Sequence, residues 1–264
     1  MDSLKAELAA LGGWLSGVAA AGRDVLFPPD CPRCGRGIAE GLVQGAGLRL
    51  CGECVGALVP GRRDVCWRCS CPVGPNLDTT QGCGQCRAER WSFERVVALG
   101  PYEGELRGAC LRSKELGGEP LAAGLAELLW AERGAELQAW GIDAVAPVPH
   151  HVRDRIQRRT LTPLVLATQL ARRLGRPLAH QIVSKVRHTP PQHRLSPTER
   201  RRNLVNAFRP SGRPRLEGAS LLIVDDVLTT GETAHRVGLA LRSAGAARLL
   251  TAVIARGGAG GGGA

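Results

Sequence analysis

The sequence has 264 residues, of which 35 are lysine or arginine and 24 are aspartate or glutamate, so its formal net charge at pH 7 is +11. This length suits one large domain, or one medium-sized domain with a small attachment, and the positive charge favours a polyanionic partner or a phosphorylated substrate. No apolar run approaches the roughly 20 residues of a membrane-spanning helix. The N-terminus also lacks a basic start followed by a long apolar core, so we expect a cytoplasmic protein with no membrane span.

Residues 1–26 are predicted to form an N-terminal amphipathic helix. Spacings of four and three residues place one set of apolar side chains on a single helix face: Leu4, Leu8, Leu11, Leu15 and Val18. This face suits docking on the protein's own core, and it also suits a partner protein or a membrane. The polar side of the helix is too weakly basic to favour a membrane.

Residues 27–90 contain nine of the ten cysteines. Eight of the nine form four Cys-x-x-Cys pairs: Cys31, Cys34, Cys51, Cys54, Cys66, Cys69, Cys83 and Cys86. Each pair directs two thiolates at one ion, and two pairs complete a tetrahedral site, so the segment predicts a small double zinc ribbon with two structural Zn²⁺ ions. Metal is favoured over disulfides in a chain without a secretory signal. We expect sequential pairing of the motifs, and a crossed arrangement also fits the spacing.

Residues 91–256 have the pattern of an α/β domain. Strands are predicted at residues 95–99, 143–149, 221–224 and 249–254, and helices at residues 104–116, 121–140, 163–174 and 234–244. Strands that alternate with helices form a mostly parallel sheet with flanking helices, and ligands bind at the carboxyl ends of its strands. The tail of glycine and alanine, residues 257–264, is predicted to be disordered.

Positive charge is concentrated in residues 150–216, which contain sixteen lysines and arginines but only two acidic residues, Asp154 and Glu199. Guanidinium groups suit bidentate phosphate contacts, so we expect this segment to face a phosphate site. Phe208 is the only aromatic residue in the span. A base-stacking platform for single strands is therefore poorly supported, and nucleic-acid binding here would act mainly through the backbone with a steep dependence on salt.

Residues 221–233 combine a buried strand, an acidic pair and a tight turn. Apolar residues 221–224 predict a short central strand, and Asp225 and Asp226 follow at its carboxyl end. A Thr-Thr-Gly-Glu-Thr turn then leads into a helix whose unpaired first amides point at an anion. The hydroxyls of the turn add donors, and these residues are the candidate phosphate-binding set: Val224, Val227, Leu228, Thr229, Thr230, Gly231, Glu232 and Thr233.

The acidic pair would repel a phosphate and instead suits neutral hydroxyls or a metal ion beside it. A ribose 5-phosphate offers both kinds of partner. Two acidic residues followed by Thr-Thr-Gly-x-Thr resemble the phosphoribosyl-pyrophosphate (PRPP) motif of type I phosphoribosyltransferases. The alternative is an ordinary strand–turn–helix crossover with a threonine cap.

Five motifs in the same order resemble the ComF family, which couples a double zinc ribbon to a type I phosphoribosyltransferase domain. They are Phe-Pro-Pro-Asp-Cys-Pro-Arg-Cys-Gly, Tyr-Glu-Gly-Glu-Leu-Arg, Pro-Val-Pro-His-His, the segment from Thr-Pro-Pro-Gln to Leu-Ser-Pro-Thr-Glu-Arg-Arg-Arg-Asn, and the PRPP motif; they begin at Phe27, Tyr102, Pro147, Thr189 and Asp225. There is one departure. The family usually continues Gly-Phe-Asn-Gln where this chain reads Arg-Thr-Leu-Thr at residues 159–162, beside the expected pyrophosphate position.

The resemblance implies a protein of natural competence that handles imported single-stranded DNA and binds PRPP with Mg²⁺. Asp225 and Asp226 would be the catalytic pair on the ribose hydroxyls. Residues that would face the pyrophosphate are Lys114, Arg153, Arg158, Lys185 and Arg187.

Two hypotheses about function remain. The protein is a transferase of nucleotide salvage or synthesis with an unknown acceptor, or it is a binding module that senses PRPP or grips nucleic acid and recruits competence proteins. The acidic pair favours PRPP binding under both hypotheses, whereas the departure at residues 159–162 favours the second.

Overall fold

The structure is a computed structural model, and it describes residues 30–38, 49–59, 61, 64–150, 161–187, 204–212 and 215–258. The predicted N-terminal helix, Arg153, Arg158 and the motifs between residues 189 and 203 lie outside these ranges. So do residues 259–264 of the predicted tail.

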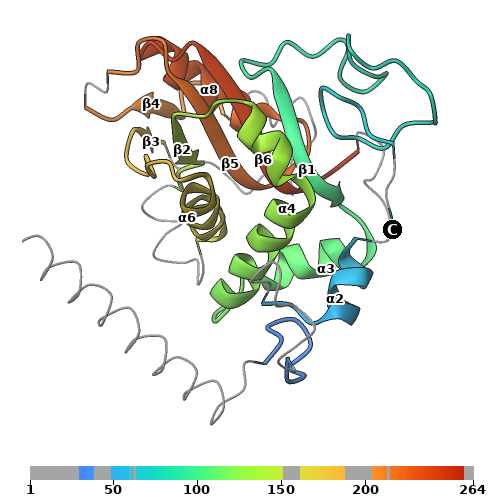
Figure 1. Cartoon of the computed structure of the whole chain (residues 1–264). Helices are drawn as coiled ribbons and strands as arrows, with labels where there is room; N and C mark the ends of the chain where they lie inside the picture. Colours follow the sequence, from blue (N-terminus) through green and yellow to red (C-terminus); the bar gives the residue numbers. More distant parts are fainter. Residues whose placement is uncertain are drawn as a thin grey trace, which may run out of the picture.

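A central sheet of four parallel strands organises the described part of the chain (Figure 1). Its order is β1-β6-β5-β2, and the strands are β1 (Arg95–Pro101), β2 (Ala144–Pro147), β5 (Ser220–Leu228) and β6 (Arg248–Arg256). The two inner strands, β5 and β6, contain the longest runs of buried residues among the four strands, as expected for strands covered on both faces. The predicted parallel sheet with flanking helices is therefore confirmed.

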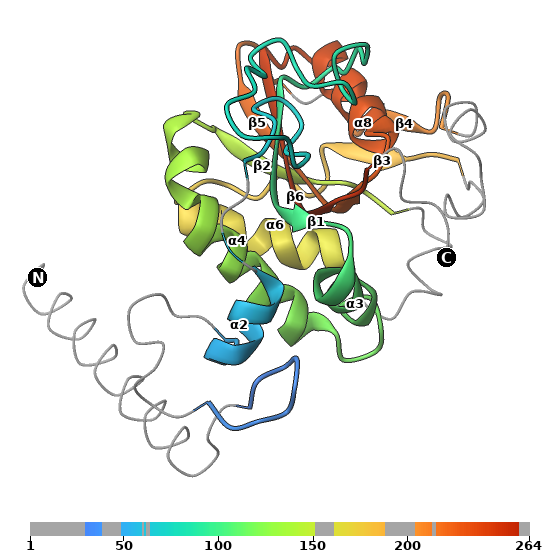
Figure 2. The same cartoon turned by 90° about the vertical axis from the view of Figure 1, so that its right-hand side faces the viewer.

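Helices cover both faces of the sheet (Figure 2). Helices α4 (Glu119–Ala139) and α6 (Thr162–Leu174) pack on one face, and α8 (Glu232–Ser243) packs on the other. The side chains of β5 alternate between these two layers with the period of a strand. Leu222 and Val224 lie in the apolar cluster of α4 and α6, whereas Leu221 and Ile223 lie in the cluster of α8.

Several elements differ from their predicted bounds. The predicted strand 221–224 runs on to Leu228, so the acidic pair lies within β5 and not after it. The predicted helix 104–116 ends at Arg112 (α3, Gly104–Arg112), because the chain turns tightly before α4. A Cβ at Gly118 would lie 2.5 Å from the Ser113 carbonyl oxygen, which shows how tight this turn is.

A small antiparallel pair, β3 (Val183–Lys185) with β4 (Phe208–Pro210), was not predicted. Each strand has only three residues, which is too short for a recognisable alternation of apolar and polar side chains. Gly257, directly after β6, continues the pairing with β5 at the carboxyl end of the sheet. It is buried, and its amide donates to the Leu228 carbonyl at 2.8 Å.

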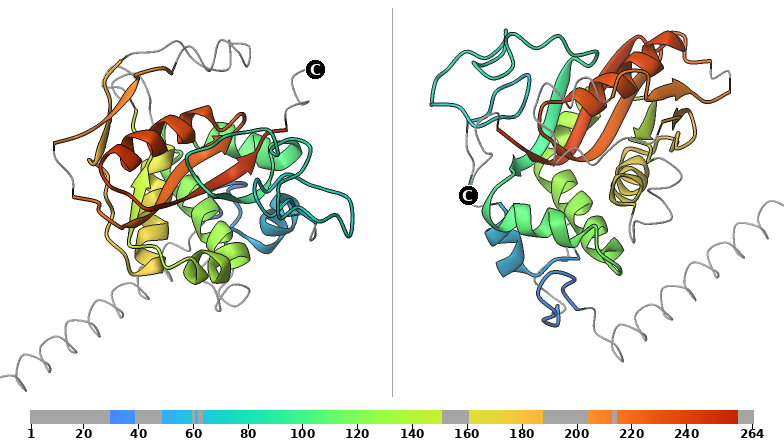
Figure 3. Two further views of the ribbon diagram at one scale, coloured as in Figure 1. Left: turned by 90° about the horizontal axis from the view of Figure 1, so that it is seen from above. Right: turned by 180° about the vertical axis from the view of Figure 1, so that it is seen from behind.

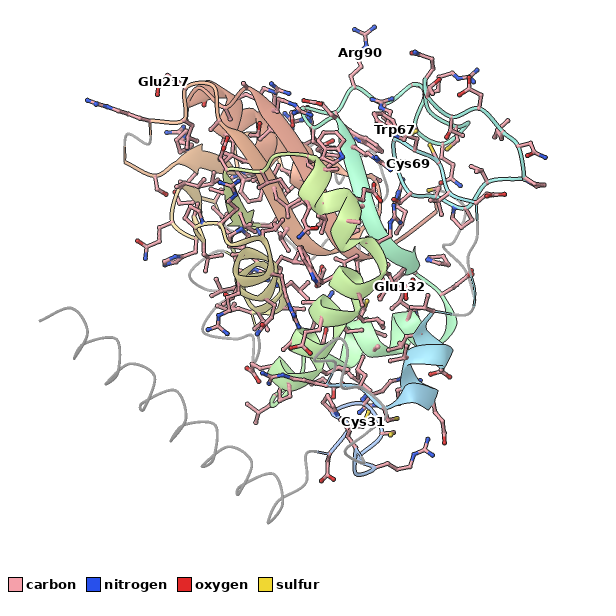
Figure 4. The ribbon with its side chains drawn as sticks, viewed as in Figure 1. Cys31, Trp67, Cys69, Arg90, Glu132 and Glu217 are labelled. Atoms are coloured by element: carbon pink, nitrogen blue, oxygen red, sulfur yellow. The ribbon has the colours of Figure 1, made fainter. Side chains whose placement is uncertain are left out.

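The two halves of the cysteine-rich segment lie at different ends of the molecule, as the labels of Cys31 and Cys69 show (Figure 4). The first half includes the short helix α2 (Gly52–Leu58), and its Leu50 and Leu58 join the apolar cluster of α4 and α6. The second half, residues 64–90, is a loop beside the end of β6 (Figure 3). Its buried cluster consists of cysteines, with Val73 and Trp91 packed against it.

Candidate functional site

The turn between β5 and α8 is built around Gly231. This residue caps α8 with a φ of +80°, a left-handed conformation that favours glycine. A Cβ at this position would lie 2.8 Å from Nε1 of Trp91, so a side chain is excluded by sterics as well as by backbone conformation. Because glycine supplies no capping side chain, the first amides of α8 are left to loop groups or to a bound anion.

Hydroxyl groups surround these amides. Thr229 is exposed, whereas Thr230 and Thr233 are half-buried, and the Thr230 hydroxyl lies 3.4 Å from the Glu232 amide nitrogen. The carboxylate of Glu232 is paired with its own helix, since Arg236 Nε donates to it at 2.6 Å. The first turn of α8 therefore presents amides and hydroxyls with its one acidic side chain already neutralised.

The acidic pair lies just before this turn, near the carboxyl end of β5. Each carboxylate accepts a hydrogen bond from the next backbone amide: Asp226 N donates to Asp225 Oδ1 at 2.9 Å, and Val227 N donates to Asp226 Oδ1 at 2.7 Å. These bonds fix the orientation of the two side chains near the end of β5, just before the turn. The structure thus brings Asp225, Asp226 and the phosphate-binding candidates of residues 227–233 into one site.

Lys114 compensates one of the two carboxylates. Its ammonium nitrogen lies 2.6 Å from Asp226 Oδ2, and the side chains are 31% and 13% exposed. Burial opposes the charges of this pair, but their mutual attraction outweighs it, so the pKa of Asp226 is lowered and that of Lys114 is raised. Burial and the neighbouring Asp226 charge raise the pKa of Asp225 well above its ordinary value. Asp225 is therefore more easily protonated than Asp226.

Of the other candidates for facing the pyrophosphate, the structure describes Lys185 and Arg187. Lys185 ends β3, and Arg187 follows it and donates through Nη2 to the Val205 carbonyl at 3.0 Å. Their role toward pyrophosphate stays a prediction, as does that of Lys114, which the structure places against Asp226.

Of residues 159–162, where the chain departs from the ComF family pattern, the last one, Thr162, has a defined structural role. Thr162 begins α6 and is buried, and its hydroxyl donates to the Ser113 carbonyl at 3.0 Å. Ser113 immediately precedes Lys114, so this bond ties the start of α6 to the turn that holds the lysine. Sequence reasoning had weighed residues 159–162 only as a lost pyrophosphate loop and had missed this contact.

The eight predicted ligand cysteines gather in two groups of four, in sequential order: Cys31, Cys34, Cys51 and Cys54, then Cys66, Cys69, Cys83 and Cys86. We call them the first and the second cysteine cluster. Their sulfurs approach to 3.7 Å between Cys34 and Cys51, and to 3.6 Å between Cys69 and Cys83. Four thiolates at zinc–sulfur distances of about 2.3 Å lie about 3.8 Å from one another in a tetrahedron. The donor set and its spacing therefore fit a tetrahedral metal ion, whereas a disulfide needs about 2.05 Å.

Two residues connect the second cysteine cluster to the turn of residues 229–233, the candidate phosphate-binding turn, which we call the phosphate turn. Sequence reasoning missed both. Arg256, at the end of β6, is 3% exposed, and its guanidinium donates to the carbonyls of Cys69, Leu228 and Thr229. Trp91 donates through Nε1 to the Thr230 carbonyl at 3.2 Å. The only signals in the sequence were an arginine that ends a buried strand and a tryptophan directly after the cysteine-rich segment.

A parallel sheet with an acidic pair, a hydroxyl-rich turn at a helix N-terminus and two groups of four cysteines that could hold metal ions is typical of a phosphoribosyltransferase-type protein with an added cysteine-rich segment. A family described as "Phosphoribosyl transferase domain" matches residues 163–262. The DNA utilization protein YhgH of Salmonella typhi is 33% identical over 202 residues, which cover 75% of this chain and 86% of that protein. The Competence protein F of Haemophilus influenzae is 32% identical over 171 residues, covering 62% of this chain and 74% of that protein. The chain belongs to the ComF family.

Among solved structures, the phosphoribosylpyrophosphate synthetase of Mycobacterium smegmatis is 20% identical with a TM-score of 0.32, and the match covers 50% of this chain and 33% of that chain. In the part of the chain that the structure describes, no helix combines the length and the apolar character needed to cross a membrane.

Proposed function

We propose that this protein binds PRPP, as its magnesium complex, at the end of β5. The 5-phosphate lies on the turn of residues 229–233, and Asp225 and Asp226 accept hydrogen bonds from the ribose hydroxyls. The single observation that carries this proposal is the position of the two carboxylates. Their own backbone bonds hold them directly before a turn that presents amides and hydroxyls.

The electrostatics of the free site support the binding of an anion. Two adjacent carboxylates would repel a phosphate, but Asp226 is paired with Lys114, which offsets part of their negative charge. The helix N-terminus adds a partial positive charge on the side of the turn. Magnesium comes mostly on the phosphates of the ligand, since this ion keeps several of its waters and binds few protein groups.

We further propose that both cysteine clusters hold Zn²⁺. Zinc supplies a tetrahedral cross-link between distant parts of the chain and has no redox chemistry of its own. In the first cluster the ion joins residues 31–34 to the start of α2, and in the second it joins residues 66–69 to residues 83–86. Four thiols at such spacing fit this structural role.

The proposed cellular role is in natural competence, in the handling of imported single-stranded DNA in the cytoplasm. Support comes from the names of the relatives, which refer to DNA utilization and competence. The net charge of +11 is consistent with a polyanionic partner. Single-stranded DNA and proteins of the competence machinery are the partners that this role implies.

Isothermal titration calorimetry with PRPP and Mg²⁺ tests the proposal. The wild-type protein binds, and Asp225→Asn and Asp226→Asn each weaken binding by about tenfold to a hundredfold, as expected for the loss of a charge-assisted hydrogen bond. Glu217→Gln is the matched control, because it also removes one carboxylate but lies exposed in the turn before β5 (Figure 4). A wild-type protein that produces no binding heat with millimolar PRPP would contradict the proposal.

Release of pyrophosphate from PRPP, measured with the same samples and candidate acceptor bases, separates the two hypotheses about activity. Release that depends on one acceptor identifies a transferase of nucleotide salvage or synthesis. Binding without release identifies a module that senses PRPP.

A further inference from the structure

The second cysteine cluster (Cys66, Cys69, Cys83 and Cys86) lies directly behind the phosphate turn. Arg256 connects the two: its Nε donates to the Cys69 carbonyl at 3.2 Å, and its Nη1 donates to the Leu228 carbonyl at 3.0 Å and to the Thr229 carbonyl. The guanidinium is buried, so these carbonyls, together with the Gly257 carbonyl that Nη1 also contacts, compensate its loss of hydration. The hydrogen bonds of Arg256 therefore require the backbone at Cys69 and the backbone of the phosphate turn to be in place at the same time.

Trp91 makes a second connection. Its indole donates to the Thr230 carbonyl, and its ring fills the space where a side chain at Gly231 would lie. Behind the indole, the guanidinium of Arg68 lies 5.4 Å from the ring centroid. Arg68 also donates to the carbonyls of Cys86 and Glu89, each at 2.6 Å. The tryptophan is thus supported by Arg68 of the first Cys-x-x-Cys motif of this cluster, which is itself bonded to the second motif at Cys86.

These contacts determine where the amides of the turn point. A trans peptide is planar, so its carbonyl oxygen and the following N–H group point in opposite directions. The Thr229 carbonyl faces Arg256, which directs the amide of Thr230 away from the cluster. The Thr230 carbonyl faces Trp91, which directs the amide of Gly231 to the same side. Arg256 and Trp91 therefore orient two amides of the phosphate turn toward the side where an anion can bind.

The second cluster cannot keep this shape by apolar packing alone. Its buried core consists of Cys66, Cys69, Cys71, Cys83 and Cys86, and among the described residues Val73 and Trp91 are the partly buried apolar neighbours. Without a metal ion, the four ligand thiols are linked to one another by weak sulfur–sulfur hydrogen bonds of 3.6 to 4.0 Å. The first cluster differs, because Leu50, Cys54 and Leu58 belong to the large apolar core of α4 and α6 at the other end of the molecule (Figure 4).

We infer that the metal ion of the second cysteine cluster holds the phosphate turn in its binding shape, with Arg256 and Trp91 as positioning residues. The inference rests on the proposed phosphate-binding function of that turn and adds a coupling between the two sites. Such coupling is reciprocal: the metal strengthens the binding of the phosphate ligand, and the ligand slows the loss of the metal.

Two cysteine variants of the full chain test the coupling. Cys83→Ser breaks the second cluster, and Cys34→Ser breaks the first, which serves as the matched control. Hydrogen–deuterium exchange is measured on peptides that cover residues 228–236, and zinc is counted with a chromogenic chelator. Both variants lose about one zinc ion per chain, but only Cys83→Ser exchanges faster in the turn and binds PRPP–Mg²⁺ about tenfold or more weakly. Equal turn exchange in Cys83→Ser and the wild-type protein would overturn the inference.

Two further variants keep the test valid if Cys83→Ser fails to fold. Trp91→Phe removes the indole donor but keeps a ring over Gly231, and Arg256→Lys keeps the charge but removes the fork of donors. We expect both to retain two zinc ions and to show faster exchange in the turn. Zinc release from the wild-type protein is then followed with and without PRPP–Mg²⁺, and the ligand slows the release of one ion of the two.

The exchange measurement also separates this inference from the proposed function. A wild-type protein that does not bind PRPP contradicts the proposed function. The difference in turn exchange between Cys83→Ser and the wild-type protein can still be measured in that case, because it needs no ligand. A wild-type protein that binds PRPP, with binding and turn exchange unchanged in Cys83→Ser, Trp91→Phe and Arg256→Lys, contradicts the coupling alone.

Discussion

Lys114 Nζ lies 2.6 Å from Asp226 Oδ2 and joins the turn after α3 to the second residue of the acidic pair. The two residues are 112 positions apart in the sequence. Their ion pair explains how a carboxylate in a mostly buried position can stay charged. It also explains why the two neighbouring carboxylates differ, with the pKa of Asp226 lowered and that of Asp225 raised.

Replacing Lys114 by methionine tests this pair. The change leaves the Asp226 carboxylate without its cation, so we expect the free energy of unfolding at pH 7 to fall by about 1–3 kcal/mol. In the wild-type protein the lowered pKa of Asp226 contributes stability above the unfolded-state pKa of about 3.9, and this is lost as the pH falls through the folded-state value. Lys114→Met removes that contribution, so its deficit in urea unfolding experiments is smaller under acidic conditions than at pH 7.

The matched control for this variant is Arg112→Met. It removes a positive charge from the same segment, but the arginine is exposed in the last turn of α3. We expect a change within about 0.5 kcal/mol, as for most surface substitutions. Equal destabilisation by the two variants would show that general charge, not the pair with Asp226, is responsible.

Asp225→Asn is expected to stabilise the fold while it weakens ligand binding. The raised pKa of Asp225 means that folding at neutral pH either buries a charge or takes up a proton. Asparagine removes this cost and can still accept the hydrogen bond from the Asp226 amide, so we expect a gain of about 1 kcal/mol at pH 7. Because the cost develops above the unfolded-state pKa of about 3.9, the gain disappears near and below that pH.

Thermal unfolding of Asp225→Asn and Asp226→Asn between pH 4 and pH 7.5 measures these opposite effects. Asp226→Asn is expected to lower stability at neutral pH, because it leaves Lys114 unpaired. If both variants changed the melting temperature in the same direction at pH 7, the opposite pKa shifts of the two carboxyl groups would be contradicted.

Gly231→Ala tests the shape of the phosphate turn. The alanine must adopt a φ of +80°, and its Cβ would lie 2.8 Å from the indole nitrogen of Trp91. Gly212→Ala is a matched control, since that glycine has a φ of +67° but open space around its Cβ position. Both variants carry backbone strain of about 1 kcal/mol. Only Gly231→Ala adds a steric conflict, so we expect it to lose more stability in urea unfolding and to lose PRPP binding.

His235 gives the protein a pH-dependent contact between α8 and the segment after the second cysteine cluster. Its Nδ1 accepts a hydrogen bond from the Ser92 amide at 3.0 Å, which requires the neutral ring, and burial lowers the pKa of the imidazole. A histidine with a lowered pKa contributes stability above its ordinary value of about 6.5, and this is lost as the pH falls below it.

His235→Gln therefore reduces the dependence of the unfolding free energy on pH between 5 and 7.5. The control is His180→Gln, because His180 is exposed. Urea unfolding at several pH values measures both slopes. An unchanged slope in His235→Gln would mean that another group is responsible for the acid sensitivity.

The sequence was sufficient for the features that local pattern determines. The apolar run of residues 221–224, the glycine turn and the apolar helix after it predicted the existence and order of the strand, the turn and α8, with α8 within two residues of its observed bounds. The four Cys-x-x-Cys pairs predicted both cysteine clusters, because each pair already holds two donors on one tight turn.

Contacts between distant segments could not be predicted in the same way. Lys114 had been considered for pyrophosphate, since nothing in its neighbourhood indicates that the tight turn at Gly118 points it at Asp226. Arg256 follows an apolar strand and has no motif of its own. Its role depends on three carbonyls from two other segments. A single sequence contains no information about such distances.

The length of β5 was also underestimated for a physical reason. Asp225 and Asp226 are unfavourable in a buried strand, so the pattern of apolar residues seemed to end at Val224. The strand continues because β6 pairs with it as far as Leu228, and because Lys114 compensates Asp226. Such a conflict between local preference and position is typical of a functional site.

A crystal structure of the protein with PRPP and Mg²⁺ tests the central claim most directly. We predict density for the 5-phosphate at the amides of residues 229–233, with the ribose hydroxyls within hydrogen-bond distance of Asp225 and Asp226. Ligand density elsewhere, or an empty turn in crystals soaked with millimolar PRPP and Mg²⁺ and free of lattice contacts at the site, would contradict it.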